Sequence, residues 1–546
     1  MDRHLDRGDA ALSDRHPNRL PAWLLVALVG PPMAFAVVFY AWPLATLLAK
    51  GLGPGAIADV LGRSQTWDVV WFTSWQAVVS TALTIVLGIV PAYVCARFQF
   101  RGRRAVLGLL TAVFVLPTVV VGAAILAVLP DSLDRSIWAV LGAHVVFNLA
   151  VVVRTVGAVW EHLPPDLEAA AATLGASPLQ VARHVTLPLL RPAITAAAAI
   201  VFLFTFTSFG VIRILGGGAR ATIEVEVWRR ATQLGEIDAA AVLSVLQLII
   251  VGGAVGWSVW SQRRHGHAIA LRPRAVRRKA RTLGERRLVV ATAAGVSGLL
   301  VVPLLALGER SVRTPDGYSW TGWTTMGRAE VRRGVRLGTN PLAALVNSLE
   351  AMAVATTLSV AIGGLATLAV AAARRGRWLD TGLMLPLGTS AVTIGFGMLI
   401  TFDTAPVDWR ASSWLLPVGH ALIAVPFVVR SAIGVLRAVD PRLVEAAATL
   451  GATPARAWAS VTLPHLWRPL ATGAGLAAAI SLGEFGATSF LSRRTTETLP
   501  IAIERLLGRT GSILQAQGYA LAVILAAVTI ALVMLSELVR DRARRS

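Results

Sequence analysis

The sequence is poor in cysteine and in charged residues. Cys95 is the single cysteine among 546 residues, which excludes an intrachain disulfide and a metal site built from cysteines. Charged residues make up 15% of the chain, whereas 55% of residues are hydrophobic and the mean hydropathy is +0.65. This composition is typical of an integral membrane protein and argues against a string of soluble domains.

The sequence also contains no phosphate-binding loop. The pattern Gly-x-x-x-x-Gly-Lys-Ser/Thr, whose backbone amides cradle nucleotide phosphates, occurs nowhere in the chain. We therefore expect this chain to bind no ATP and no other cofactor. No clustered nucleophile, base and metal ligands are present either, so we predict no catalytic residues and no metal site, and an embedded enzyme or a scaffold is unsupported.

Acidic residues are scarce relative to basic ones. The chain has 30 Asp and Glu against 51 Lys and Arg, a net charge of +21. Such an excess attracts either nucleic acid or anionic lipid. The arginines cluster at 97–104, 374–377 and 540–545, directly after apolar stretches, and all three clusters fall on one side of a membrane. They predict cytoplasmic loops beside lipid, with no nucleic-acid partner.

Twelve apolar stretches are long enough to cross a membrane, which takes about 20 helical residues. They lie near 22–49, 68–96, 105–129, 137–160, 193–215, 239–260, 288–308, 344–373, 379–402, 413–437, 470–491 and 516–539. We predict an all-α membrane protein of about twelve transmembrane helices. The arginine clusters place both termini in the cytoplasm, and the N-terminal apolar stretch is interpreted as a retained span rather than a signal peptide.

One unit of sequence occurs twice. Residues 168–178 read Glu-Ala-Ala-Ala-Ala-Thr-Leu-Gly-Ala-Ser-Pro, and residues 445–454 read Glu-Ala-Ala-Ala-Thr-Leu-Gly-Ala-Thr-Pro. A shift of 276 positions relates the copies and also carries His144 to His420. Six spans in each copy enter the membrane in the same direction, so the copies form a parallel repeat around a shared pathway.

The repeat divides the chain into five parts. We predict a cytoplasmic tail at 1–21, a first unit at 22–261, a basic cytoplasmic linker at 262–287, a second unit at 288–540 and a cytoplasmic tail at 541–546. The repeated segments fall in cytoplasmic loops at 161–192 and 438–469. Their Pro and Gly positions predict a helix-turn-helix in each loop. These loops are either simple connectors or two equivalent docking surfaces, and the matched Thr-Leu-Gly-Ala and Val-Thr-Leu-Pro elements favour docking.

These segments resemble the EAA loop of permease subunits of type I binding-protein-dependent ABC importers. The second copy has the family spacing, whereas in the first Glu168 lies one residue further from Gly175, so that Ala169 aligns with Glu445. The resemblance implies that both loops couple the chain to an ATP-binding subunit. The residues it assigns to coupling are Ala169, Ala170, Gly175, Ala176, Pro178, Leu187, Pro188, Glu445, Ala446, Ala447, Gly451, Ala452, Pro454, Leu463 and Pro464.

The resemblance also implies partners and a location. It implies two copies of an ATP-binding subunit, which would use ATP and Mg²⁺, an extracytoplasmic solute-binding protein, and a bacterial cytoplasmic (inner) membrane. Two six-span units in one chain are similar to the fused permeases of thiamine and ferric-iron importers. The stretches at 72–77, 144–148, 207–218 and 481–486 look more like the thiamine type. A ferric-iron or phosphonate permease stays open, and so does an ion-coupled secondary transporter, which would not need the paired loops.

Glu484 is the most suggestive ionisable residue within a span. A charge at the bilayer centre costs about 2.5–3.5 kcal/mol on insertion scales, so it needs a partner or a wet cavity. The position equivalent to Glu484 is Ser208. One hypothesis is that Glu484 faces the pathway and favours a cation such as thiamine; the other is a carboxyl paired across helices. The neighbouring Phe209 and Phe485 are further candidates for the pathway.

His144, His420 and Asn148 complete the candidate pathway residues. The two histidines are equivalent in the repeat. One histidine from each half is thin support for a metal site, so we predict that they form hydrogen bonds between helices. Asn148 is interpreted in the same way.

Overall fold

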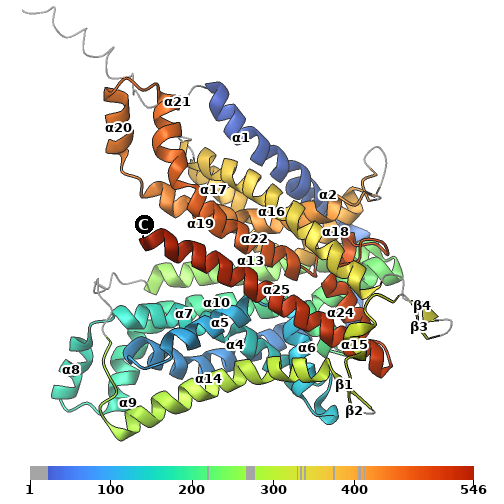
Figure 1. Ribbon diagram of the computed structural model, residues 1–546, viewed down its shortest axis with the longest axis horizontal. Helices are drawn as coiled ribbons and strands as arrows, with labels where there is room; N and C mark the ends of the chain where they lie inside the picture. The colour runs from blue at the N-terminus through green and yellow to red at the C-terminus, as the bar shows by residue number, and fades with distance from the viewer. Residues whose placement is uncertain are drawn as a thin grey trace, which may run out of the picture.

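The computed structural model of the chain is a large bundle of helices (Figure 1). It describes residues 22–217, 220–265, 277–315, 317–328, 330–332, 335–336, 340–372, 376–403, 408–410 and 412–545. The predicted tail at 1–21, residues 266–276 of the predicted linker and residue 546 lie outside the described residues.

Most elements are helices, and the described residues contain only four short strands. The helices of the first half are α1 (Ala22–Ala36), α2 (Trp42–Gly51), α3 (Pro54–Gly62), α4 (Ser64–Arg97), α5 (Arg103–Val115), α6 (Thr118–Val128), α7 (Ile137–His162), α8 (Pro165–Thr173), α9 (Pro178–Val181), α10 (Leu187–Phe206), α11 (Gly210–Leu215), α12 (Ile223–Arg229) and α13 (Ile237–His265). Those of the second half are α14 (Leu283–Arg310), α15 (Thr321–Thr324), α16 (Pro341–Ala372), α17 (Gly376–Met384), α18 (Ala391–Thr401), α19 (Leu415–Arg437), α20 (Pro441–Thr449), α21 (Pro454–Ala457), α22 (Trp467–Gly483), α23 (Thr488–Leu491), α24 (Leu499–Leu507) and α25 (Ser512–Arg545). The strands β1 (Arg313–Thr314) and β2 (Gly317–Tyr318), and β3 (Glu330–Arg332) and β4 (Val335–Arg336), form two antiparallel hairpins.

Short irregular turns join several helices. Four are π turns and three are 3-10 turns: Val37–Ala41, Ala182–Thr186, Arg230–Leu234, Trp458–Thr462, Asp131–Leu133, Leu385–Gly388 and Leu463–His465. The first of them makes α1 and α2 one apolar helix from Trp23 to Gly51.

Nine helices within the described ranges are long and apolar enough to cross a membrane. Two further spans are bent pairs, in which α5 meets α6 at 108° and the 379–388 segment meets α18 at 99°. The 17-residue helix α22 occupies the place of the eleventh predicted stretch.

The structure interrupts four stretches that the sequence predicts as single spans. The stretch at 105–129 breaks before Pro117, which has no amide hydrogen and disfavours a helical conformation in the residue before it. The stretch at 379–402 restarts at α18, where Ser390 caps the helix by accepting from the amide of Thr393 at 3.1 Å. The stretches at 193–215 and 470–491 end as helices at Phe206 and Gly483.

The first long helix of each half packs on the other half. Helix α1 lies along α16, and Leu28 of α1 shares an apolar cluster with Leu368 and Ala369 of α16. Helix α14 lies along α4, α5 and α6. Figure 1 shows the blue α1 among the yellow and orange helices of the second half, and the yellow-green α14 beside the blue and teal helices of the first. The spatial lobes therefore exchange these helices relative to the sequence repeat.

Equivalent close contacts hold each lobe together. A Cβ atom on Gly88 of α4 would lie 2.7 Å from Val152 Cγ1 of α7, and one on Gly363 of α16 would lie 2.8 Å from Val428 Cγ1 of α19. Small residues at such points let helix backbones approach within a membrane, where dispersion contacts drive packing.

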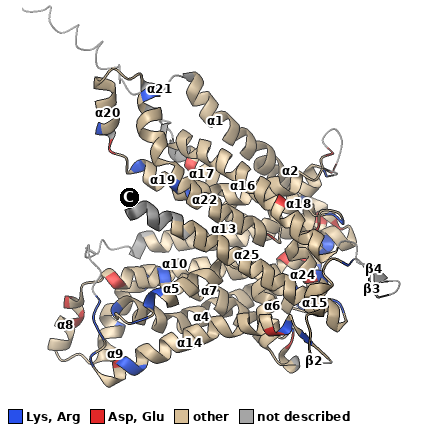
Figure 2. Ribbon diagram, viewed as in Figure 1, with Lys and Arg blue, Asp and Glu red and all other residues tan. Residues whose placement is uncertain are grey.

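Charged side chains concentrate at the two ends of the long helices. Figure 2 shows Lys and Arg near α5 and α9 at one end and near α24 and β2 at the other, with mostly tan ribbon between. Part of the predicted linker lies at the first of these ends, where the amide of Gln99 donates to the carbonyl of Arg278 at 2.9 Å and the amide of Arg278 donates to that of Arg97 at 3.0 Å. This distribution fits charge kept outside a hydrocarbon layer.

Candidate functional site

Each copy of the repeated segment forms a helical hairpin that projects from the same end of the bundle. In Figure 1, α8 and α9 lie at the lower left and α20 and α21 at the upper left. Helix α8 ends where the amide of Leu174 donates to the carbonyl of Ala170 at 3.2 Å and that of Ala176 donates to the carbonyl of Ala171 at 3.1 Å. Gly175, with φ of +87°, supplies the left-handed residue that this helix stop requires.

The second hairpin repeats this geometry. The amide of Leu450 donates to the carbonyl of Ala446 at 3.2 Å, and that of Ala452 donates to the carbonyl of Ala447 at 3.1 Å. Gly451 has φ of +85°. The two turns are therefore the same structure built from equivalent residues.

The hairpins differ in how their second arms begin. Ser177 and Gln180 form a capping box around Pro178 at the start of α9. In the second hairpin, the amide of Arg456 donates to Thr453 Oγ1 at 3.4 Å within α21, which begins at Pro454. The arms then run toward Leu187 and Pro188, and toward Leu463 and Pro464, all four of which are exposed.

A large apolar side chain stands at the tip of each hairpin. Leu174 and Leu450 occupy equivalent positions, and each is 88% exposed. Leu179 of the first hairpin is 78% exposed. Large apolar side chains that a rigid turn keeps exposed are typical of a surface that binds a partner.

The carboxylates of the two hairpins have different surroundings. Glu168 forms an ion pair with Arg97 at 3.1 Å between Oε1 and Nη2, and the same oxygen accepts from Thr186 Oγ1 at 2.9 Å. Glu445 is exposed, and within the described part of the chain no ion pair is recorded for it. The exposed Ala169 aligns with Glu445, so the two hairpins present different side chains at that position.

The interruptions of the four broken spans meet in the middle of the bundle, along a line we call the seam. A Cβ atom on Gly210 would lie 2.3 Å from Thr118 Oγ1, and one on Gly486 would lie 3.0 Å from the Cβ of Ala391. Across the two halves, a Cβ atom on Gly483 would lie 3.0 Å from Pro117 Cγ. Glycine is needed here because the chain segments are in direct contact.

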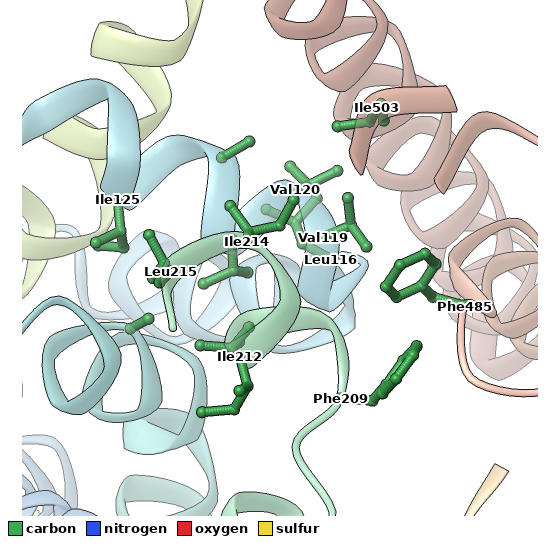
Figure 3. Close-up of a cluster of buried hydrophobic side chains, with 14 of the residues drawn as sticks. Leu116, Val119, Val120, Ile125, Phe209, Ile212, Ile214, Leu215, Phe485 and Ile503 are labelled. Carbon is green, nitrogen blue, oxygen red and sulfur yellow. The ribbon is translucent and has the colours of Figure 1, made fainter. Parts of the chain in front are cut away.

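Two equivalent phenylalanines meet across the seam. Figure 3 shows the rings of Phe209 and Phe485 facing each other from opposite halves, and their centroids are 5.0 Å apart. Both are buried among aliphatic side chains such as Val119 and Ile503. In this conformation the seam is closed by apolar contact.

Glu484 stabilises the loop that begins the second half of its broken span. Its carboxylate accepts from the amides of Ala487 and Thr488 at 2.9 and 2.8 Å and from Thr488 Oγ1 at 2.7 Å. His420 Nε2 lies 3.6 Å from the same carboxylate. The side chain is 4% exposed. The hydrogen bonds of Glu484 therefore go to its own loop, with His420 of α19 beside it, and both hypotheses about Glu484 stay predictions.

The two histidines bridge helices through hydroxyl groups. His144 lies 2.9 Å from Ser80 Oγ on one side and 2.9 Å from Ser208 Oγ on the other. His420 lies 2.9 Å from Ser481 Oγ and 2.7 Å from Thr488 Oγ1. The ranges that the structure describes contain no group of three or more His, Cys, Asp or Glu placed to hold a metal.

Asn148 belongs to the same buried region as His144. Its amide nitrogen donates to the carbonyl of His144 at 2.9 Å, one turn earlier on α7. Asn148 is 1% exposed.

Comparison with known proteins assigns the family. A family model described as binding-protein-dependent transport system inner membrane component matches residues 84–259 and again residues 359–545. The chain belongs to this family. Each match covers one copy of the repeat, so the chain is a fused permease of two units from a binding-protein-dependent importer, as the EAA-type segments predict.

Relatives of this permease match it along most of its length. The thiamine transport system permease protein ThiP of Escherichia coli is 27% identical over 533 residues, which cover 91% of this chain and 93% of that protein. ThiP of Salmonella typhimurium is 25% identical over 527 residues, with the same coverage. A putative 2-aminoethylphosphonate transport system permease protein of Salmonella typhimurium is 31% identical over 166 residues, 30% of this chain and 62% of its own.

The family settles the general predictions. The chain is an all-α, multi-pass inner-membrane permease with tandem units, as predicted, and permeases of this kind work with ATP-binding and solute-binding partners. The structure separates the candidate residues of this permease into two groups, the exposed hairpins and the buried seam. The histidine, asparagine and phenylalanine candidates all fall in the second group.

Sequence reasoning missed several charged residues of the permease near the seam. Arg213 pairs with Glu504 of the other half, and Glu224 accepts from Gln247 Nε2 at 2.5 Å in a buried site. Arg213 lies inside the quoted 207–218 stretch, but its partner is 291 positions away. The signal for Arg213 and Glu224 in the sequence is a charge inside an apolar region, the same signal that marks Glu484.

Proposed function

We propose that this chain is the thiamine permease of an ABC importer. The thiamine assignment is supported by relatives named as thiamine transport permeases, which match 91% of the chain and 93% of their own length. The partial match to the phosphonate permease covers less than a third of the chain, and the carboxylates near the seam, Glu484 and Glu224, suit a cation better than a phosphonate anion.

In this proposal the hairpins are the contacts with two ATP-binding subunits. Leu174 and Leu450 enter an apolar cleft on each subunit, and the backbone turns at Gly175 and Gly451 hold them rigidly. Closure of the two subunits on ATP and Mg²⁺, which they rather than this chain bind, moves the hairpins as levers. A rigid hairpin transmits such a movement because its turn is fixed by hydrogen bonds.

The seam is then the gate of the translocation pathway. Rotation of the two lobes separates Phe209 from Phe485 and exposes Ser208 and Glu484 to the solute. The hairpins and both termini lie in the cytoplasm, and a solute-binding protein docks at the opposite end, near α15 and α24. The proposal keeps the five-part division of the chain that the sequence predicts, and adds that the first helix of each unit packs on the other unit.

Uptake by purified components tests the proposal. The chain is co-expressed with its ATP-binding subunit and reconstituted in liposomes with the solute-binding protein encoded beside it. We expect uptake of radiolabelled thiamine that requires ATP and the binding protein. Thiamine uptake driven by a proton or sodium gradient in the absence of the ATPase would instead identify a secondary transporter.

A further inference from the structure

Helices α12 and α24 are equivalent in the repeat and lie on opposite sides of the seam, at its end far from the hairpins. Each contributes one residue at the same repeat position. The shift of 276 carries Trp228 of α12 to Glu504 of α24. It also carries Phe209 to Phe485, whose rings are in contact. Trp228 and Glu504 form one pair of equivalent positions, and Phe209 and Phe485 form another. In each pair one residue comes from each unit, and both pairs lie around the same place between the halves.

The guanidinium of Arg213 occupies that point. Its central carbon lies 3.9 Å from the centroid of the Trp228 ring, a cation–π distance, and it forms an ion pair with Glu504. Phe209 lines the same place, since its ring centroid is 6.5 Å from that of Trp228. Arg213 is therefore held by an indole from the first unit and a carboxylate from the second.

The guanidinium is incompletely satisfied. Arg213 Nε is buried and has no hydrogen-bond partner among the residues that the structure describes. The side chains of Arg213 and Glu504 are 21% and 22% exposed, so the pair is not fully enclosed by protein. The position equivalent to Arg213 is Ser489, so the repeat supplies one such cation and not two.

We propose that Trp228, Glu504 and the Phe209–Phe485 pair form a binding site for a flat organic cation, and that Arg213 fills this site while the permease is empty. A guanidinium is planar, delocalised and weakly hydrated, which makes it a close chemical substitute for an aromatic cation such as a thiazolium. An arriving cation takes over the indole face and the carboxylate, and Arg213 swings away.

This exchange gives the site a gating role. Arg213 links the two units through Glu504, so its release removes an ionic contact between the lobes at the moment a cation arrives. The charge of the site stays balanced throughout, because one cation replaces another beside the same carboxylate. The identity of the cation rests on the proposed thiamine function, whereas its chemical class rests on the contacts of Arg213.

Opposite effects of two substitutions test the site. The full chain with its ATP-binding subunit is placed in nanodiscs, and binding of radiolabelled thiamine is measured without the solute-binding protein. Arg213→Met removes the resident cation and is expected to tighten thiamine binding, whereas Glu504→Gln is expected to weaken it on the order of tenfold. Arg213→Lys, which keeps the charge but not the planar group, is expected to lie between Met and the parent.

Two controls separate this site from a structural ion pair. Glu497→Gln breaks the neighbouring, partly buried pair with Arg505, whose closest atoms are 3.0 Å apart, and is expected to change thiamine binding much less than Glu504→Gln. The uncharged analogue of thiamine, in which a thiophene replaces the thiazolium, is expected to bind the parent and Glu504→Gln equally. Thermal unfolding of each variant shows whether it is folded.

The outcomes distinguish this inference from the proposed function. Equal loss of thiamine binding in Arg213→Met and Glu504→Gln, or no thiamine binding by the parent, overturns the site. Loss of the uncharged analogue in parallel with thiamine also overturns it. ATP-driven uptake by the parent with its binding protein is measured in a separate experiment. That experiment alone tests the assignment as an importer.

Discussion

Single residues in this chain are constrained most strongly where two helix backbones touch. Gly88 and Gly363 lie at corresponding crossings, of α4 with α7 and of α16 with α19, and each faces a valine of the other helix. An added methyl group has no room at either point, because it would sit within 2.8 Å of a valine carbon. Such overpacking costs about 1–3 kcal/mol.

We therefore expect Gly88→Ala and Gly363→Ala each to destabilise the permease by about 1–3 kcal/mol. The measurement is the midpoint of thermal unfolding in detergent, followed by a thiol-reactive dye that reports exposure of Cys95, which is buried in the folded chain. Gly142→Ala is the matched control, since a Cβ atom there meets nothing within 4 Å. A control that lowers the midpoint as much as the two test variants would contradict the packing argument.

The Arg97–Glu168 pair gives a second prediction for single residues. Glu168 is bound by Arg97 and Thr186, whereas Glu445 has no ion pair recorded among described residues. Glu168→Gln should lower the unfolding midpoint of the isolated permease by an amount equivalent to about 0.5–1.5 kcal/mol, and Glu445→Gln should change it little. Equal effects of the two variants would show that Glu168 is not a structural clamp.

The sequence predicts the displaced register of Glu168 but not its partner. Arg97 is the last residue of α4 and Glu168 lies in α8, and the packing of α4 against α7 brings the two residues together. The same limit applies to Arg213 and Glu504. A pattern in the sequence identifies an unusual residue, whereas its partner depends on a tertiary contact.

At the scale of elements, the hairpins could be predicted well and the breaks of the membrane spans could not. Pro165, Gly175 and Pro178 set the ends of the hairpin helices through local chemistry that a sequence displays. The breaks near Pro117 and Ser390 lie inside continuous apolar stretches, where hydropathy carries no signal for a bend. Pro117 and Ser390 mark the breaks locally, but how the broken ends pack depends on glycines of the opposing segments, which the sequence does not pair.

The hairpin turns are expected to fail when glycine is replaced by alanine. A residue with a Cβ atom pays roughly 1–2 kcal/mol in the left-handed conformation that Gly175 and Gly451 adopt. Gly175→Ala and Gly451→Ala should each reduce retention of the ATP-binding subunit during co-purification. Asparagine tolerates this conformation better, so Gly175→Asn should retain more of the subunit than Gly175→Ala. The reverse order would show that the backbone conformation is not what the partner requires.

At the scale of the whole molecule, the exchange of first helices makes the two sequence units interdependent. Neither unit buries its apolar surface alone, because α1 packs on α16, α2 packs on α18 as well as on α13 of its own unit, and α14 packs on α4, α5 and α6. The repeat predicts two parallel units around a shared axis, but it does not predict that their first helices pack on the other unit. Both arrangements preserve the same spans and loops, and they differ only in which lobe receives a helix.

A designed disulfide tests the exchanged arrangement. A Cβ atom on Gly397 of α18 would lie 3.3 Å from the Cβ of Pro43 of α2, close to the separation of about 3.5–4.5 Å that a disulfide requires. Cys95→Ser first removes the single native cysteine, and a specific protease site is inserted at residue 270. With Pro43→Cys and Gly397→Cys, oxidation followed by cleavage should leave the two halves as one band on a non-reducing gel.

The control pair keeps Gly397→Cys and replaces Pro43→Cys with Gly30→Cys, in the α1 part of the same apolar helix, where a Cβ atom meets nothing within 4 Å. That variant should separate into two fragments after cleavage, because its cysteine is too far from position 397 to react. Separation of the Pro43–Gly397 variant into two fragments under the same oxidation would contradict the exchange. In that case the first helix would lie on its own unit, and the lobes would move as the sequence repeat divides them.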